Sequence, residues 1–369
     1  MPESRLDKLS ARGQSVWIDY LSRDLLEQGE LKRMMKEDAV VGVTSNPTIF
    51  QKAISQGNAY DEQLKELLEE ETDAKEIFLR LAVRDVEEAL ELLATVHEKN
   101  GQDGYVSLEV DPTLAYDTEA TYAEAIRFHE WIDKPNLYVK IPATKPGLAA
   151  IEDCIAAGRS INVTLIFSLQ RYREVVEAYL RGLERLVASG GKPAGVRSVA
   201  SFFVSRVDTE TDKRLDEIGT KDALALRGKL AIANAKLAYE HYQAAFSGPR
   251  WEFLAGKGAL PQRCLWASTS TKNPDYRDVL YVEELIGPET VDTMPEETIE
   301  AFQDHGEVDG DTVTKGVKEA HKLLEQLAAA GIDYDDVVLK LEEEGVQKFA
   351  DSFAELLDGV RAKREVVAA

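Results

Sequence analysis

Eight short runs of apolar, largely β-branched residues alternate with longer amphipathic segments along this chain of 369 residues. Runs that are apolar nearly throughout are typical of parallel strands, because helices cover the outer face of the sheet that such strands form. We predict strands over residues 16–20, 41–45, 105–110, 137–141, 161–167, 199–204, 264–267 and 290–293. Eight such strand–helix units in one chain predict an α/β fold, a closed (β/α)8 TIM barrel.

The segments between the strands predict extra helices around this barrel. Residues 48–104 and 209–262 each contain more than one helical pattern, and the tail over 311–364 is largely helical, with Gly331 and Gly345 as breaks. Ser168 is expected to cap the helix that follows it. An open doubly wound sheet is the main alternative, and the lack of a G-x-G-x-x-G turn after the first strand disfavours it. No linker of low complexity divides the chain, so we predict a single domain over residues 1–369.

The charge balance restricts the partners of the chain. With 67 acidic and 44 basic side chains the formal net charge is −23, which disfavours binding to nucleic acids and anionic membranes but not to a small anion. The two cysteines lie far apart without a C-x-x-C or histidine cluster, so neither a disulfide framework nor a metal site is expected. The charged N-terminus and the lack of a 20-residue apolar run predict a cytoplasmic location.

Lys140 interrupts the fourth apolar run, Leu-Tyr-Val-Lys-Ile-Pro. An ammonium is almost never fully buried without a partner, so this lysine either reaches water from an edge strand or has a chemical role. A desolvated lysine can lose its proton more easily and attack a carbonyl to form a Schiff base. The neighbouring candidate residues distinguish the structural interpretation of this lysine from the chemical one.

Polar side chains recur at or near the carboxyl ends of the predicted strands. They are Asp19, Asn46, Glu109, Lys140, Asn162, Thr164, Ser201, Arg206 and, after the seventh strand, Lys272. These strand ends converge on one face of a barrel, where such enzymes have their active sites. A ring of polar groups drawn from seven strands is hard to explain by stability alone, because each group must be desolvated and hydrogen-bonded.

The residue types fit Schiff-base chemistry on a sugar phosphate. Glu109 and Thr164, through an ordered water, could deliver and remove the protons that imine formation requires. Asp19 could take the proton of the departing hydroxyl while a carbon–carbon bond next to the iminium breaks. A further group of polar side chains could bind the substrate: Asn46, Asn162 and Ser201 at sugar hydroxyls, and Arg206 with Lys272 at a phosphate.

Five segments resemble the signature segments of the transaldolase family, in the order found there. They are residues 43–50 (VTSNPTIF), 107–111 (SLEVD), 139–144 (VKIPAT), 161–168 (INVTLIFS) and 201–206 (SFFVSR). The resemblance extends from about Trp17 to the end of the chain. It implies a (β/α)8 barrel that transfers a dihydroxyacetone unit from a ketose phosphate to an aldose phosphate in the pentose phosphate pathway, without metal or organic cofactor. A symmetric homodimer is the default expectation.

By the same resemblance, Lys140 is the Schiff-base nucleophile, Glu109 and Thr164 handle the catalytic water, and Asp19 is the acid and base. The substrate-binding residues it implies are Asn46, Asn162, Ser201, Phe203 and Arg206. In related sugar-phosphate aldolases a tyrosine stands where this chain has Phe203, and its hydroxyl helps water release the bound enamine. Phenylalanine therefore favours a transferase over a lyase.

Several alternatives remain open at this stage. Asp19 could cap the following helix, Asn46 before Pro47 could be a turn residue, and Arg206 could pair with Asp208 at the surface. Where many family members have an arginine, this chain has Lys272, which is either a weaker phosphate ligand or an ordinary loop lysine. The alternative functions are a sugar-phosphate aldolase and a phosphosugar-binding barrel without catalysis. The last helix, over residues 346–357, has an apolar stripe that could pack on the barrel wall, reach over the mouth of the active site or join an interface. We expect it to pack on its own barrel wall.

Overall fold

The eight strands form a closed barrel in chain order, with every neighbouring pair parallel. The computed structural model describes residues 4–55, 58–69, 71 and 73–367. The strands are β1 (Gln14–Ile18), β2 (Val40–Thr44), β3 (Tyr105–Glu109), β4 (Leu137–Pro142), β5 (Ile161–Ile166), β6 (Ser198–Phe203), β7 (Arg263–Ala267) and β8 (Thr290–Met294). The predicted fold and all eight predicted strands are confirmed.

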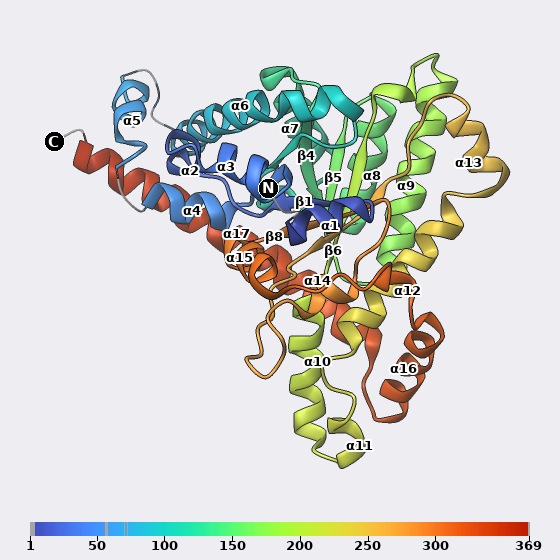
Figure 1. The fold of residues 1–369 in the computed structure, drawn as a ribbon. Helices are drawn as coiled ribbons and strands as arrows, with labels where there is room; N and C mark the ends of the chain where they lie inside the picture. The colour runs from blue at the N-terminus through green and yellow to red at the C-terminus, as the bar shows by residue number, and fades with distance from the viewer. Residues whose placement is uncertain (1–3, 56–57, 70, 72, 368–369) are drawn as a thin grey trace.

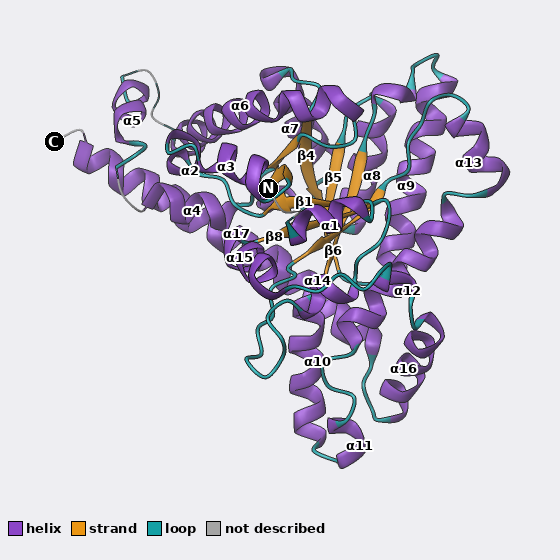
Figure 2. Cartoon of the chain, in the orientation of Figure 1, coloured by secondary structure: helices purple, strands orange, loops and turns teal. Residues whose placement is uncertain are grey.

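Helices surround the strands on all sides, as Figure 2 shows. They are α1 (Arg5–Ala11), α2 (Arg23–Glu27), α3 (Glu30–Glu37), α4 (Pro47–Ser55), α5 (Asp61–Leu67), α6 (Ala74–Asn100), α7 (Thr118–Ile132), α8 (Lys145–Ala156), α9 (Leu169–Ala188), α10 (Ser205–Ile218), α11 (Lys221–Leu224), α12 (Leu230–Ala245), α13 (Gly248–Ala255), α14 (Leu280–Glu284), α15 (Glu296–His305), α16 (Val317–Ala329) and α17 (Tyr334–Val367). Three single 3₁₀ turns are η1 (Pro112–Leu114), η2 (Pro193–Gly195) and η3 (Thr312–Thr314). The extra helices predicted within 48–104 and 209–262 are present.

Three predicted helix boundaries have different outcomes. Ser168 caps α9, because its hydroxyl accepts a hydrogen bond from the backbone N–H of Arg171 at 2.9 Å. Gly331, with φ of 96°, separates α16 from α17 as predicted. The predicted break at Gly345 is wrong, since this glycine lies inside α17. A β-carbon there would come within 3.2 Å of Leu165 and 3.3 Å of Phe167, so the glycine allows the helix to approach the barrel closely.

The register of the barrel places the expected catalytic side chains next to one another. Glu109 on β3 is paired with Lys140 on β4, and Lys140 is paired in turn with Asn162 on β5. Side chains of paired residues in parallel strands point to the same face of the sheet, so this register brings the three together.

Helix α17 crosses the end of the barrel at which the strands finish (Figure 1). It contacts α4, where the hydroxyl of Thr48 donates a hydrogen bond to Ser352 at 2.8 Å. Phe353 of α17 packs edge-on against Phe78, which packs in the same way against Phe50. The last helix therefore packs on its own barrel, but it covers the mouth, which was one of the alternatives, and not the outer wall that we expected.

In the part of the chain that the structure describes, no helix combines the length and apolar character needed to span a bilayer. Cys154 and Cys264 are both buried as free thiols.

Candidate active site

Lys140 lies buried in the middle of β4, with 4 % of its surface exposed. Its Nζ is 3.1 Å from Oε2 of Glu109 and donates a hydrogen bond to the backbone oxygen of Ser45 at 2.9 Å. A buried ammonium is tolerated when a carboxylate and hydrogen-bond acceptors surround it. The alternative of an edge-strand lysine reaching water is wrong.

The carboxyl group of Glu109 is well placed to accept a proton from this lysine. Burial raises its pKa, and the nearby Lys140 charge opposes that rise. Apart from the ion pair with Lys140, neither carboxylate oxygen has a hydrogen-bond partner among the described residues. A carboxylate with a raised pKa beside an ammonium can take up its proton, which leaves a neutral amine.

Thr164, in the second half of β5, has a buried hydroxyl that lacks a hydrogen-bond partner within the described residues. Buried polar atoms of native proteins are nearly always hydrogen-bonded, so an unpartnered hydroxyl facing a cavity indicates where water or substrate binds. The expected role of Thr164 at a catalytic water stays a prediction.

Asp19 follows β1 directly and faces the same cavity. Its Oδ1 accepts a hydrogen bond from the hydroxyl of Thr44 at 2.7 Å. Burial raises the pKa of Asp19, whereas Lys140 and the Thr44 hydrogen bond lower it. The helix-cap alternative is wrong, because Ser22 caps α2 by accepting the N–H of Leu25 at 3.2 Å.

Asn162 and Ser201 belong to a hydrogen-bonded chain that runs across three strands inside the barrel. Ser201 donates to the side-chain oxygen of Asn162 at 2.7 Å, and the Asn162 amide donates to Ser107 at 3.0 Å. Because this chain occupies the side-chain oxygen of Asn162 and one amide hydrogen, the residue is held rigidly beside Lys140.

Asn46 has two roles at once. Its side-chain oxygen accepts the backbone N–H of Ile49 at 3.0 Å, so it caps α4, with Pro47 at the first helical position. The alternative of a structural role for Asn46 at the turn before α4 is therefore confirmed, because its side-chain oxygen is used there. The same side chain also lines the cavity, where its amide group can face a substrate.

The cavity has a volume of about 380 Å³ and lies at the carboxyl ends of the strands, beneath α17. Eight of the ten predicted site residues line it, namely Asp19, Asn46, Lys140, Thr164, Ser201, Phe203, Arg206 and Lys272. Glu109 and Asn162 are not among the lining residues and lie behind the wall beside Lys140. Sequence reasoning therefore placed eight of its ten candidates at one cavity, and their catalytic and binding roles stay predictions.

Arg206, in the first turn of α10, stacks on Phe203, with its guanidinium carbon 5.2 Å from the ring centroid. Burial lowers the pKa of Arg206, partly offset by Asp19. The predicted alternative of an ion pair with Asp208 is wrong. Asp208 instead accepts hydrogen bonds from the Ala231 N–H at 2.7 Å and the Tyr281 hydroxyl at 2.9 Å.

The residues of the cavity wall that sequence reasoning missed include Lys52 of α4 and Lys348 and Phe349 of α17. The ring centroid of Phe349 is 6.0 Å from Nζ of Lys140. Within its own helix, Phe349 belongs to an ordinary apolar stripe, and Lys52 and Lys348 resemble solvated lysines. The path of α17 over the mouth brings Lys348 and Phe349 to the cavity, whereas Lys52 reaches it from α4.

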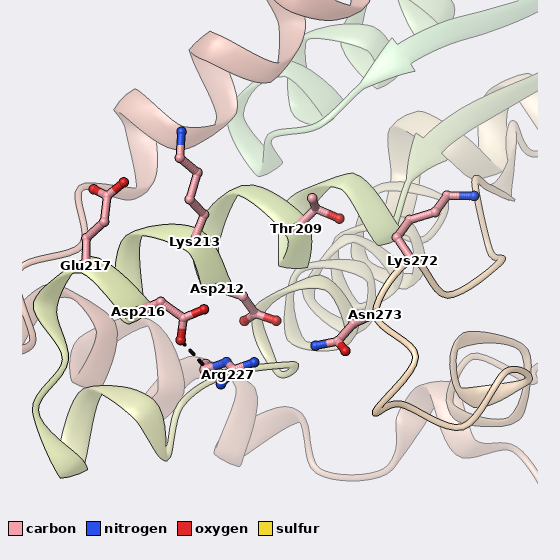
Figure 3. A pocket seen from close by; sticks show the side chains of 8 residues that line it. All are labelled: Thr209, Asp212, Lys213, Asp216, Glu217, Arg227, Lys272 and Asn273. Atoms are coloured by element: carbon pink, nitrogen blue, oxygen red, sulfur yellow. Dashed lines mark ion pairs between the residues drawn. The ribbon is translucent and has the colours of Figure 1, made fainter.

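A second hollow, of about 510 Å³, adjoins the active cavity and contains Lys272 (Figure 3). Its other charged side chains are mainly acidic, and Arg227 pairs with Asp216 at 3.3 Å. Figure 3 shows the Lys272 ammonium pointing away from Asp212 and Asp216. Its Nζ instead donates to the hydroxyl of Ser270 at 2.5 Å, and Ser270 lines the active cavity.

The described residues contain no cluster of three or more His, Cys, Asp or Glu side chains that is arranged to hold a metal ion. A closed parallel barrel with a buried lysine and two carboxyl groups at the ends of its strands has the architecture of a (β/α)8-barrel enzyme.

Comparison with known proteins identifies the family. The family model described as Transaldolase/Fructose-6-phosphate aldolase matches residues 16–360. Similar proteins named transaldolase include one from Frankia alni, 53% identical over 353 residues and 95% of each chain, and one from Mycobacterium tuberculosis, 52% identical over 365 residues and 98% of each chain. A protein from Streptomyces coelicolor named transaldolase 1 is 53% identical over 356 residues, covering 96% of this chain and 93% of its own. The chain belongs to the transaldolase family.

Proposed function

We propose that the protein transfers a dihydroxyacetone unit between sugar phosphates, sedoheptulose 7-phosphate plus glyceraldehyde 3-phosphate giving erythrose 4-phosphate plus fructose 6-phosphate, through a Schiff base on Lys140. The single observation that carries the proposal is the buried ion pair of Lys140 and Glu109, 3.1 Å apart. It lies beside a cavity that also contains Asp19 and a group of cationic side chains. Membership of the transaldolase family supports the same reaction.

In the first stage, the Lys140 ammonium gives a proton to Glu109, and the free amine attacks the ketone carbon of the donor sugar. The carbinolamine that forms then loses its hydroxyl as water, with a proton returned by Glu109 through a water held at Thr164. The raised pKa of Glu109 suits this exchange, since its proton affinity is moved towards that of the amine.

In the second stage, Asp19 takes the proton of the hydroxyl on the fourth carbon, and the bond between the third and fourth carbons breaks. The electron pair of that bond moves into the iminium and gives an enamine, while the aldose phosphate departs. The enamine then attacks the aldehyde of the acceptor, and Asp19 returns the proton to the new hydroxyl. Hydrolysis of the final iminium frees the new ketose phosphate and Lys140.

Phe203 favours transfer over release in this scheme. Its ring has no hydroxyl to help water protonate the enamine, and Arg206 covers one of its faces. The test is a coupled assay with fructose 6-phosphate and erythrose 4-phosphate, with and without the acceptor. We expect fast formation of sedoheptulose 7-phosphate with acceptor and little free dihydroxyacetone without it. Release of dihydroxyacetone as fast as transfer would instead indicate an aldolase.

The remaining expectations stay predictions. They are a cytoplasmic location, a symmetric dimer, a single domain, and activity without metal or organic cofactor. Sedimentation tests the symmetric dimer, and activity in the presence of a chelator tests the independence from metal ions.

A further inference from the structure

Four cationic side chains surround one end of the active cavity, and each comes from a different element. They are Lys52 of α4, Arg206 of α10, Lys272 of the loop after β7 and Lys348 of α17. None of the four forms an ion pair with a carboxylate of the described residues. In a chain with a formal net charge of −23, most cations can find an acidic neighbour, so four unpaired cations around one cavity need an explanation.

Repulsion among these cations lowers the pKa of one of them. The pKa of Lys348 is lowered, mainly by the charge of Arg206, then by burial and by Lys272 and Lys52. Two acidic side chains, Asp19 and Glu297, also line the cavity without forming an ion pair with any of the four. An anion that entered among the cations would remove this repulsion and gain from all four charges.

The four cations belong to two parts of the cavity lining. Arg206 and Lys272 belong to the barrel, whereas Lys52 and Lys348 belong to a wall that α4 and α17 build together. A hydrogen bond of 2.8 Å between Thr48 and Ser352 joins these two helices.

The close contacts of Gly345 hold α17 at the barrel mouth, three residues before Lys348. The next residue, Phe349, has its ring 6.0 Å from the Schiff-base lysine. Two successive residues of α17 thus reach the site, Lys348 among the four cations and Phe349 near the Lys140 amine.

The structure assigns to Lys348 and Lys52 a role as substrate-phosphate ligands, so that the last helix completes the phosphate site. The identity of the anion, the phosphate monoester of a sugar, rests on the function proposed above. Lys272 provides a point charge and not the two-pronged contact of an arginine, which leaves phosphate oxygens for further donors. Lysines on long flexible stems can also follow a phosphate whose position shifts with the length of the sugar.

The test uses the full-length variants Lys348→Met and Lys52→Met, with inorganic phosphate as the probe in titration calorimetry. Each variant should bind phosphate about tenfold more weakly, the usual loss when one charged hydrogen-bond donor is removed. The KM for fructose 6-phosphate should rise with little change in kcat, while kinetics with unphosphorylated fructose stay unchanged. Lys348→Arg, which keeps the charge, should keep the affinity.

The matched control is Lys340→Met, on the same helix two turns earlier. Lys340 is paired with Glu210 at 2.8 Å and does not line the cavity, so phosphate affinity and KM should stay the same. Thermal unfolding and circular dichroism show whether each variant is folded, and Lys348→Gln serves if the methionine variant is not. Phosphate affinity within about twofold of the unmodified protein in both Lys348 and Lys52 variants would overturn the inference. Because phosphate binding needs no turnover, a failure of the transfer reaction alone would contradict only the proposed function.

Discussion

Replacing Lys140 by methionine tests the physical basis of the site through stability alone. The substitution leaves the Glu109 carboxylate buried without its ion-pair partner, and neither of its oxygens has another hydrogen-bond partner among the described residues. Removing one partner of a buried ion pair costs about 3–5 kcal/mol. The backbone oxygen of Ser45 also loses its donor at 2.9 Å, which adds about 1 kcal/mol at every pH.

The larger part of this loss should depend on pH. Burial already raises the pKa of Glu109, and losing the Lys140 charge raises it further. The folded variant therefore binds a proton at Glu109 in a pH range where the unfolded chain does not, so stability falls as pH rises through that range. The slope is about 1.4 kcal/mol per pH unit, between the ordinary glutamate pKa of 4.5 and the raised folded pKa. Below that range the carboxyl group is neutral in both states, and the penalty largely disappears.

Urea denaturation followed by tryptophan fluorescence measures the effect, because Trp17 and Trp266 are fully buried in the barrel. The denaturation midpoint of Lys140→Met should lie further below that of the unmodified protein at pH 8 than at pH 5. The control is Glu109→Gln combined with Lys140→Met, which has no titrating group here and should regain stability at pH 8. The same deficit at both pH values, with no recovery in the double variant, would refute the reasoning.

Three further substitutions test neighbouring parts of the site. Thr44→Val removes the hydrogen bond that lowers the pKa of Asp19, so the acid limb of the pH profile of kcat/KM should move to higher pH. An acid limb at the same pH would contradict the role of Asp19 as the base. Phe349→Ala removes a buried ring and should lower the free energy of unfolding, measured in urea, by about 3–5 kcal/mol. The variant should also release more free dihydroxyacetone per transfer, because the ring lies near the Lys140 amine. Release equal to that of the unmodified protein would show that the ring does not shield the amine. Tyr276→Phe breaks the 2.5 Å hydrogen bond from this tyrosine to Asp212, which holds the loop after β7. The KM for phosphorylated donors should then rise about threefold with kcat unchanged. An unchanged KM would mean that this hydrogen bond does not position the loop.

The barrel could be predicted because its determinants are local. Apolar runs of five or six residues, each followed by an amphipathic segment, specify parallel strands without reference to distant contacts. The side chains at the strand ends then follow from the geometry of the barrel, which explains why Lys140, Glu109 and Thr164 could be named from the sequence. Motif order within the transaldolase family pointed to the same residues.

The parts that sequence reasoning missed depend on tertiary contacts. Gly345 suggests a helix break by propensity, but its contacts with Leu165 and Phe167 make it a site of close packing. Nothing within α17 shows that this helix turns back over the strand ends, so Lys348 resembles a surface lysine. Arg206 and Asp208 lie two residues apart in sequence, yet the turn of α10 sends them to different partners.

The most direct test of the central claim is borohydride trapping. The protein is incubated with fructose 6-phosphate, reduced and digested, and the added mass of a three-carbon unit is located by peptide mass spectrometry. Lys140→Met serves as the control. We predict a stable dihydroxyacetone-derived adduct on Lys140 that is absent from the variant. No adduct, under conditions that trap another Schiff-base aldolase, would contradict the covalent mechanism and leave a barrel that only binds phosphosugars.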